Sequence, residues 1–214
     1  MLATPSPDRP VRGWFVALEG GEGAGKSTQA SQLAEWLTDR GHEVVLTFEP
    51  GDTAVGRRLR ALLLAHEAGP LAPRTEALLF AADRAQHVAE VVRPALDRGA
   101  VVITDRYVDS SLAYQGAGRT LPVDDVAMLS TWATDALVPD VTVVLDLPPD
   151  VGLARVPGDA DQMEAQPQAF HERVREGFLA LARAEPQRYL VVDSTAEPDS
   201  VQERIREHLA AVIR

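Results

Sequence analysis

Several residue types and patterns are missing from this sequence, and each absence excludes a class of protein. There is no cysteine, which excludes disulfides, catalytic thiols and thiolate zinc sites. No apolar run of about 18 residues occurs, so the sequence predicts no membrane-spanning helix. Residues 1–13 are rich in proline and polar residues and lack the apolar segment of a signal peptide. We therefore expect a cytoplasmic protein with a flexible tail at 1–13 and a single domain at 14–214.

Lysine is almost absent: of the 21 lysine and arginine residues, all but Lys26 are arginine. The formal net charge is −11, with acidic residues along the whole chain, and such a surface repels nucleic acid and anionic membranes. We therefore expect neither a nucleic-acid partner nor a membrane partner. Attraction for a phosphorylated ligand must come from a few well-placed cations and backbone N–H groups.

Short apolar segments alternate along the chain with segments of helical periodicity. Strands are predicted at 14–19, 44–48, 101–104, 141–147 and 189–193. Helices are predicted at 27–40, 55–65, 74–98, 122–136, 170–184 and 199–214, with Pro94 bending or interrupting the third. Strands that are apolar without alternation are typical of a parallel sheet covered on both faces. The pattern predicts a doubly wound α/β domain with a five-stranded parallel sheet. A short mobile lid is expected at 156–167, where periodicity is lost.

Residues 20–27 fit the motif G-x-x-x-x-G-K-[ST] between a predicted strand and a predicted helix. Glycines let the backbone fold around a phosphate, and the N-terminus of the following helix favours negative charge. A glycine-rich turn without a ligand is the alternative, but the only lysine stands where the motif requires one. A GTPase is excluded, because its guanine-reading Asn-Lys-x-Asp motif needs a second lysine. We expect a P-loop NTPase fold that binds ATP through Gly20, Gly21, Glu22, Gly23, Ala24, Gly25, Lys26, Ser27 and Thr28.

Four segments resemble bacterial thymidylate kinases, in family order and at family spacing: residues 15–29, 49–53, 79–84 and 105–116. The resemblance extends from about residue 14 to the C-terminus, and the last segment is its most specific part. It implies a three-layer P-loop nucleoside monophosphate kinase fold and ATP- and Mg²⁺-dependent phosphorylation of dTMP to dTDP, a step in dTTP biosynthesis. It also implies a homodimer, formed through apolar helix faces near 62–64 and 78–92.

Residues within and beside these segments are candidates for binding the acceptor. Arg60, Arg84 and Arg106 can grip a phosphate through paired N–H donors, and the resemblance implies that they contact the acceptor nucleotide. For Arg60 the alternative is a solvated helix cation. The resemblance also implies that Phe80 stacks on thymine, for which core packing is the alternative, and that Tyr114 crowds the 2′ position. The residues predicted to bind dTMP are Glu49, Pro50, Arg60, Phe80, Arg84, Arg106, Ser111, Tyr114 and Gln115, whose amide matches the imide edge of thymine.

Phosphoryl transfer depends mainly on positioning and on neutralising charge. Asp105 ends an apolar strand and is placed to orient Mg²⁺, although a strand-end cap is the alternative role. Glu22 resembles an acidic residue that many family members have in this loop, and it either helps to hold Mg²⁺ or the acceptor or is simply solvated. The predicted catalytic residues are Lys26, Arg106, Asp105, Glu22 and Arg155, and the predicted metal ligands are Ser27 and Asp105.

The predicted lid departs from the family pattern. Members without an arginine in the phosphate loop usually supply arginines from the lid, but the segment 155–164 is short and has Gln162 at a position that is generally arginine. An arginine that meets the transferred phosphoryl contributes about 10³ to 10⁵ in rate. Three explanations stay open: Arg155, Arg173 or Arg175 takes over, the enzyme is slow, or the chain is a non-catalytic nucleotide-binding regulator. The acceptor also stays open between dTMP and another monophosphate, dUMP or a cytidylate, because a methyl pocket discriminates by only about 1 to 3 kcal/mol.

Overall fold

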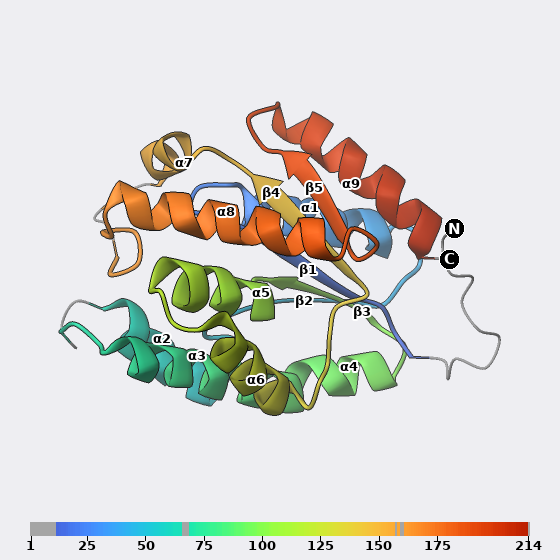
Figure 1. Ribbon diagram of the computed structural model, residues 1–214. Coiled ribbons are helices and arrows are strands. Elements are labelled where there is room, and N and C mark those ends of the chain that lie inside the picture. Colours follow the sequence, from blue (N-terminus) through green and yellow to red (C-terminus); the bar gives the residue numbers. More distant parts are fainter. Residues whose placement is uncertain (1–11, 66–68, 157, 159–160, 214) are drawn as a thin grey trace.

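A computed structural model describes residues 12–213, apart from 66–68, 157 and 159–160. At its centre is a sheet of five parallel strands in the order β2-β3-β1-β4-β5 (Figure 1). Because β1 lies in the middle and the chain winds outward from it in both directions, the doubly wound parallel sheet of the prediction is confirmed. Residues 1–11 of the expected tail lie outside the described residues. The strands are β1 (Phe15–Gly20), β2 (Val44–Phe48), β3 (Val101–Asp105), β4 (Val141–Asp146) and β5 (Tyr189–Asp193).

Burial explains why the strands read as continuous apolar runs. Every residue of β1 is buried, and β3 and β4 are buried except at their terminal aspartates. The two edge strands are less enclosed, and Leu46 and Val191 are exposed there. A strand with helices on both faces has no solvent side, so polar residues collect at its ends.

Helices cover both faces of the sheet and make a three-layer domain (Figure 1). On one face, α1 (Lys26–Thr38) and α9 (Pro198–Val212) bury residues such as Leu33 and Ile205 against the strands. On the other face, α8 (Gln168–Ala184) packs against β4 and β5. Within the described ranges, no helix combines the length and the apolar character needed to cross a membrane. The remaining α-helices with predicted counterparts are α2 (Ala54–Leu64), α3 (Pro73–His87), α4 (Arg93–Asp97) and α6 (Val123–Thr134).

Pro94 neither ends nor breaks its helix, because the turn before it changes type. α3 passes into a π-helical turn, η2 (Val88–Val92), and then into α4, with right-handed helical dihedrals at both junctions. The N–H of Arg93 bonds to the carbonyl of Val88, five residues earlier. A proline has no N–H and its ring crowds the preceding turn, and a wider turn accommodates both effects.

Two helical stretches have no counterpart in the periodicity. α5 (Val108–Ser111) leads directly into a π-helix, η3 (Leu112–Gly118), and α7 (Pro149–Arg155) follows β4. η3 packs closely on α8: a Cβ added at Gly118 would lie 2.6 Å from the ring of Phe170. Tertiary packing on α8, and not a local apolar pattern, therefore stabilises η3.

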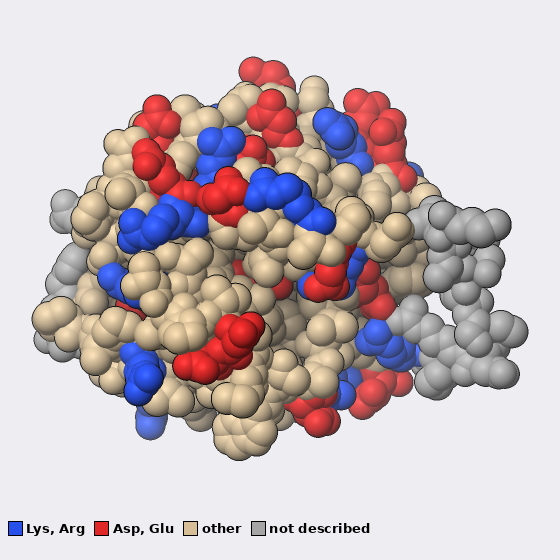
Figure 2. All heavy atoms as spheres, viewed as in Figure 1, with Lys and Arg blue, Asp and Glu red and all other residues tan. Residues whose placement is uncertain are grey.

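The face that carries α8 has acidic and basic side chains side by side (Figure 2). Among the described residues, two ion pairs involve this helix: Arg183 with Glu176, and Arg175 with Asp146 at 2.6 Å. The acidic excess of the whole chain is thus accompanied on this face by local charge pairing.

Candidate active site

A glycine-rich loop joins β1 to α1, as the motif predicts. The φ values of Gly20, Gly23 and Gly25 are 139°, 64° and 87°. Glycine adopts such positive φ angles without strain. The loop also rests on α7: a Cβ at Gly23 would lie 2.0 Å from the carbonyl oxygen of Gly152. Two glycine backbones therefore meet directly, and a side chain at either position would push the loop away from α7.

Lys26 is the first residue of α1, and its side chain folds back along the loop. It is 7% exposed, and Nζ donates to the carbonyl oxygen of Gly21 at 2.7 Å. Burial lowers the pKa of Lys26, the charge of Arg106 lowers it further, and the carboxylates of Glu22 and Asp105 raise it. A phosphate that enters the loop adds negative charge beside this amine and favours its protonated form.

Ser27 and Asp105 meet at the carboxyl end of the sheet. Ser27 Oγ donates to Asp105 Oδ2 at 2.6 Å, and the two residues come from the start of α1 and the end of β3. A hydroxyl and a carboxylate are hard oxygen donors of the kind that bind Mg²⁺, which keeps waters and phosphate oxygens as its other ligands. The two side chains fit a magnesium ion that arrives with a nucleotide.

Glu22 is part of a half-buried polar cluster, in which it is paired with Arg106. Nη2 of Arg106 lies 2.9 Å from both carboxylate oxygens of Glu22, and the hydroxyl of Tyr114 donates to one of them at 2.7 Å. Burial raises the pKa of Glu22, but Arg106, Lys26 and the Tyr114 hydrogen bond outweigh it and lower the pKa to about 2. Glu22 is therefore ionised, and it holds the Arg106 guanidinium beside the loop.

The backbone of Arg106 has an unusual conformation that aims its side chain. Its φ is 73°, a left-handed region that costs a non-glycine residue roughly 1 to 3 kcal/mol. Two hydrogen bonds hold this residue: its N–H donates to the Leu18 carbonyl at 2.9 Å, and Thr104 Oγ1 donates to its carbonyl at 2.8 Å. Nη1 then reaches the carbonyl of Gly20 at 3.2 Å. The strain is thus concentrated at the residue that links β3 to the phosphate loop.

Two cavities meet at this cluster. The larger, of about 600 Å³, lies over the glycine-rich loop, and most of the predicted ATP-binding residues line it, from Glu22 to Thr28. The smaller, of about 140 Å³, is lined by Glu49, Pro50, Arg60, Phe80, Arg106, Ser111, Tyr114 and Gln115, which are the predicted acceptor residues apart from Arg84. The residues that line both cavities are Glu22, Glu49, Arg60, Arg106 and Glu164. A ligand in one cavity therefore meets a ligand in the other between Arg60 and Arg106.

Comparison with known proteins identifies the family. The family model described as "Thymidylate kinase" matches residues 18–205. The chain belongs to the thymidylate kinase family. It is 55% identical over 209 residues to a thymidylate kinase of Clavibacter michiganensis, covering 95% of this chain and 94% of the relative. It is 51% identical over 201 residues to one of Cutibacterium acnes, covering 94% and 98%. A crystal structure of thymidylate kinase from Ehrlichia chaffeensis superposes with a TM-score of 0.77 at 31% identity, covering 93% of this chain and 99% of that one.

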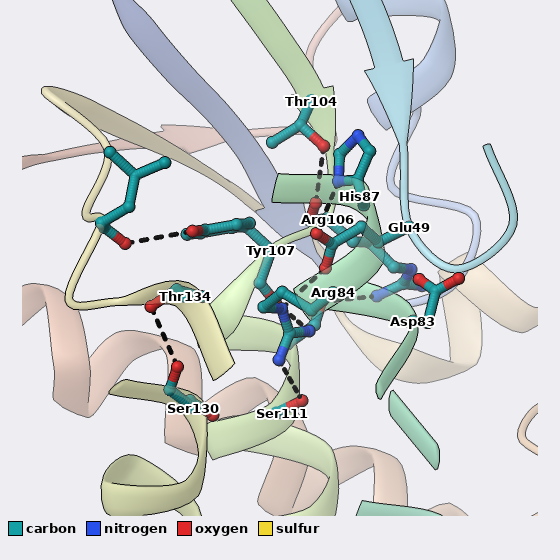
Figure 3. Close-up of polar contacts among 12 residues, drawn as sticks. Glu49, Asp83, Arg84, His87, Thr104, Arg106, Tyr107, Ser111, Ser130 and Thr134 are labelled. Carbon is teal, nitrogen blue, oxygen red and sulfur yellow. Dashed lines mark hydrogen bonds and ion pairs between the residues drawn. The ribbon is translucent and has the colours of Figure 1, made fainter. Parts of the chain in front are cut away.

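In this member of the thymidylate kinase family, Arg84 lies behind the smaller cavity and not on its surface. It is 2% exposed, and its guanidinium donates to Glu49 Oε2 at 2.7 Å, to Ser111 Oγ at 3.0 Å and to the Tyr107 carbonyl at 3.0 Å (Figure 3). Glu49 also contacts His87 Nδ1 at 2.7 Å. Arg84 thus supports two residues that line the cavity. Its direct contact with an acceptor stays a prediction.

The three arginines considered as replacements for a lid arginine have different positions. Arg155, at the end of α7, lines the larger cavity, and its Nη1 donates to the Ser194 carbonyl at 3.2 Å. Arg173 donates instead to the backbone of Gly118 at 2.8 Å, and Arg175 forms its ion pair with Asp146. Neither of these two lines either cavity. Of the three, only Arg155 faces the site of the predicted reaction.

Part of the expected lid covers the smaller cavity. Residues 157 and 159–160 lie outside the described residues, but Asp161, Met163 and Glu164 line this cavity. Gln162, at the position where the family generally has arginine, donates through Nε2 to the carbonyls of Ala65 at 2.5 Å and Gly69 at 3.3 Å. It connects this segment to the end of α2 and provides no cation.

Glu19 is a buried carboxylate that the motif analysis does not single out. It is fully buried and accepts hydrogen bonds from the N–H of Tyr107 at 2.8 Å and from Ser110 Oγ at 2.6 Å. Burial and the nearby Asp109 raise the pKa of Glu19 to about 8. It ties β1 to the start of α5 and so places the residues that follow Arg106. The signal available in the sequence is a carboxylate inside an apolar strand.

Proposed function

We propose that the protein transfers the γ-phosphoryl group of ATP to dTMP, giving ADP and dTDP. The observation that carries this proposal is the meeting of a phosphate-loop cavity and a second cavity at Arg60 and Arg106. The second cavity presents an aromatic ring, Phe80, and an amide, Gln115, as a nucleobase would require. Membership of the thymidylate kinase family supports the same reaction.

In the proposed reaction an oxygen of the dTMP phosphate forms a bond to the γ-phosphorus of ATP. The bond from that phosphorus to the β,γ-bridging oxygen breaks, and ADP leaves with the electron pair. The acceptor phosphate is already ionised at neutral pH, so no general base is needed. Lys26 and the loop hold the donor, while Arg60 and Arg106 hold the acceptor phosphate in line. Ser27 and Asp105 would hold Mg²⁺, which would supply neutralisation of the charge on the donor phosphates.

Tyr114 is proposed to select against ribonucleotides. Its hydroxyl is held by Glu22 at 2.7 Å, and its ring makes edge contacts with Phe170 and Phe178, with centroids 6.0 and 6.1 Å away. A side chain fixed from both ends cannot move aside for an extra hydroxyl. The rigid ring therefore supports exclusion of a 2′-hydroxyl from the acceptor sugar.

Arg155 is proposed as the cation that meets the transferred phosphoryl. It lines the larger cavity, over the glycine-rich loop. Among the described residues, its guanidinium donates to one backbone carbonyl and to no carboxylate. A guanidinium without a paired carboxylate moves to a phosphate at little electrostatic cost. Arg173 and Arg175, which have closer protein acceptors, are less suited to this role.

The kinase is proposed to act as a homodimer. Apolar side chains on α3 and α6 are exposed: Leu78 is 57%, Met128 69% and Trp132 83% accessible. The two helices pack against each other, so their exposed residues form one surface. An apolar surface of this kind is typical of a protein–protein interface. The part of this surface on α3 falls within the range 78–92 that the sequence analysis expects at a dimer interface. The part on α6 was not expected.

The decisive experiment follows the phosphoryl group itself. ATP radiolabelled at the γ-position should transfer label to dTMP, and a coupled ADP-release assay should rank dTMP first in a panel with dUMP and dCMP. A non-catalytic regulator would bind ATP and dTMP in equilibrium dialysis without transfer of label. A kinase for another monophosphate would show a higher kcat/KM for dUMP or dCMP than for dTMP.

A further inference from the structure

Gln115 is buried at the wall of the acceptor cavity, and one end of its amide is already in use. It lies in η3, is 1% exposed and lines the smaller cavity. Its Nε2 donates to Glu76 Oε1, on α3, at 2.9 Å. An amide has a donor end and an acceptor end, so the residue that binds one end determines what the other presents to a ligand.

The carboxylate of Glu76 also accepts hydrogen bonds from Arg119. Arg119 donates to both carboxylate oxygens through Nε at 3.2 Å and to Oε2 through Nη2 at 2.9 Å. Arg119 is fixed in turn by Gln166 Oε1 at 2.8 Å and by its position over the Phe170 ring, 5.0 Å from the centroid. A carboxylate paired with a guanidinium has no proton to donate, so Gln115 can face Glu76 only with its NH₂ group.

This arrangement excludes the flipped amide. Turning the Gln115 amide over would place its carbonyl oxygen against the Glu76 carboxylate, and a buried acceptor pair without a proton is costly. The amide oxygen and the second N–H of Gln115 are therefore the groups left for a ligand, and their order along the amide edge is fixed.

The fixed order matches one class of pyrimidine. Thymine and uracil present an N3–H donor beside the O4 acceptor, whereas cytosine presents an N3 acceptor beside an amino donor. We propose that the Glu76–Arg119 pair, acting through Gln115, makes the acceptor site select imide bases over cytosine. The inference rests on the proposed function and makes Glu76 and Arg119 positioning residues that do not touch the substrate.

The test is the ratio of kcat/KM values for dTMP, dUMP and dCMP in wild type and in Glu76→Gln. A glutamine at 76 can accept or donate, so Gln115 can adopt either order. We expect the dTMP-to-dCMP ratio to fall at least about tenfold, while the dTMP-to-dUMP ratio stays within about twofold, because both bases carry the same imide edge. If the variant loses activity on dTMP and dCMP by the same factor, Glu76 has only a structural role and the proposal is overturned.

Two further proteins separate selectivity from stability. The double variant Glu76→Gln/Arg119→Gln leaves no half-buried guanidinium without its carboxylate partner and should show the same loss of selectivity. Asp140→Asn is the matched control: this carboxylate also accepts from an arginine, Arg12 at 2.9 Å, and from a backbone N–H, that of Phe15 at 2.9 Å. It precedes β4, at the opposite end of the sheet from the active site, so its ratios should equal those of wild type.

Assays of the wild-type protein test both proposals without requiring that any variant folds. No transfer to dTMP would refute the proposed function. Transfer to dTMP with a dTMP-to-dCMP ratio below about ten would refute the present inference and leave the proposed function intact.

Discussion

Gly152→Ala offers a direct test of how closely the phosphate loop depends on α7. Gly152 lies within α7, where alanine is the better helix former, so the substitution carries no local penalty. The added Cβ would, however, lie 2.1 Å from the carbonyl oxygen of Glu22. Because real Cβ atoms essentially never approach within 3.0 Å, the loop or α7 has to move by roughly 1 Å. A misplacement of this size can cost about 10²-fold in rate.

We therefore expect Gly152→Ala to lower kcat by about 10- to 10²-fold and to reduce the free energy of unfolding by about 1 to 3 kcal/mol. Coupled ADP release gives kcat and both KM values, and thermal unfolding followed by circular dichroism gives stability. Gly177→Ala, in α8, is the control, since the nearest atoms to its Cβ would lie at 3.2 Å (Ala117 Cβ), 3.3 Å (Ala113 Cα) and 3.5 Å (Ala113 Cβ), which requires a shift of only a few tenths of an ångström. A folded Gly152→Ala protein with wild-type kcat would refute the idea that this contact shapes the loop.

Three other outcomes are expected. Arg155→Ala should lower kcat at least about 10²-fold while the nucleotide dissociation constants barely change. Arg173→Ala, the control, should leave kcat unchanged. If wild type and Arg155→Ala transfer the phosphoryl group at the same rate in single-turnover assays, Arg155 has no role in the mechanism. The pKa of Glu19 is raised from 4.5 to about 8 in the folded state, so the folded protein binds more protons than the unfolded chain in this window and stability should fall as pH rises from about 4.5 to 8. Glu19→Gln should flatten that decline in urea-unfolding midpoints, and an unchanged pH profile would contradict the assignment. Trp132→Glu should convert the dimer to a monomer of 23.1 kDa in analytical ultracentrifugation; a wild type that is already monomeric at micromolar concentration would refute the dimer.

The strands could be predicted from the sequence because each is an apolar run buried on both faces. β2 and β5 occur at the predicted residues, β3 and β4 differ by one residue at one end, and β1 is shifted by one residue at both ends. α5, η3 and α7 could not be predicted, since each has at most seven residues and is too short to show a helical period, and η3 and α7 also contain glycine or proline. η3 is held by its contact with α8, which joins residues far apart in the sequence. Local periodicity carries no information about such a contact.

The candidate site was predictable where a motif specifies backbone shape and chemistry together. Glu22 to Thr28 line the larger cavity, and eight of the nine residues predicted to bind dTMP line the smaller one. That these residues bind nucleotides stays a prediction. The orientation of side chains was not predictable: Arg84 turns into a buried network, and Gln162 binds backbone carbonyls. Glu76 and Arg119 were missed altogether. Their proposed role depends on contacts of Glu76, on α3, with Gln115, in η3, and with Arg119, the residue that follows η3.

The position of Lys26 has a chemical consequence for the whole chain. Since no other lysine exists, any reagent or enzyme that modifies lysine side chains can act only at the end of the glycine-rich loop. An acylating reagent or a lysine-specific protease has one internal target, and that target is 7% exposed. Acetylation that many proteins tolerate on their outer surfaces would here modify only the residue proposed to meet the donor phosphates, and a nucleotide bound there would shield it.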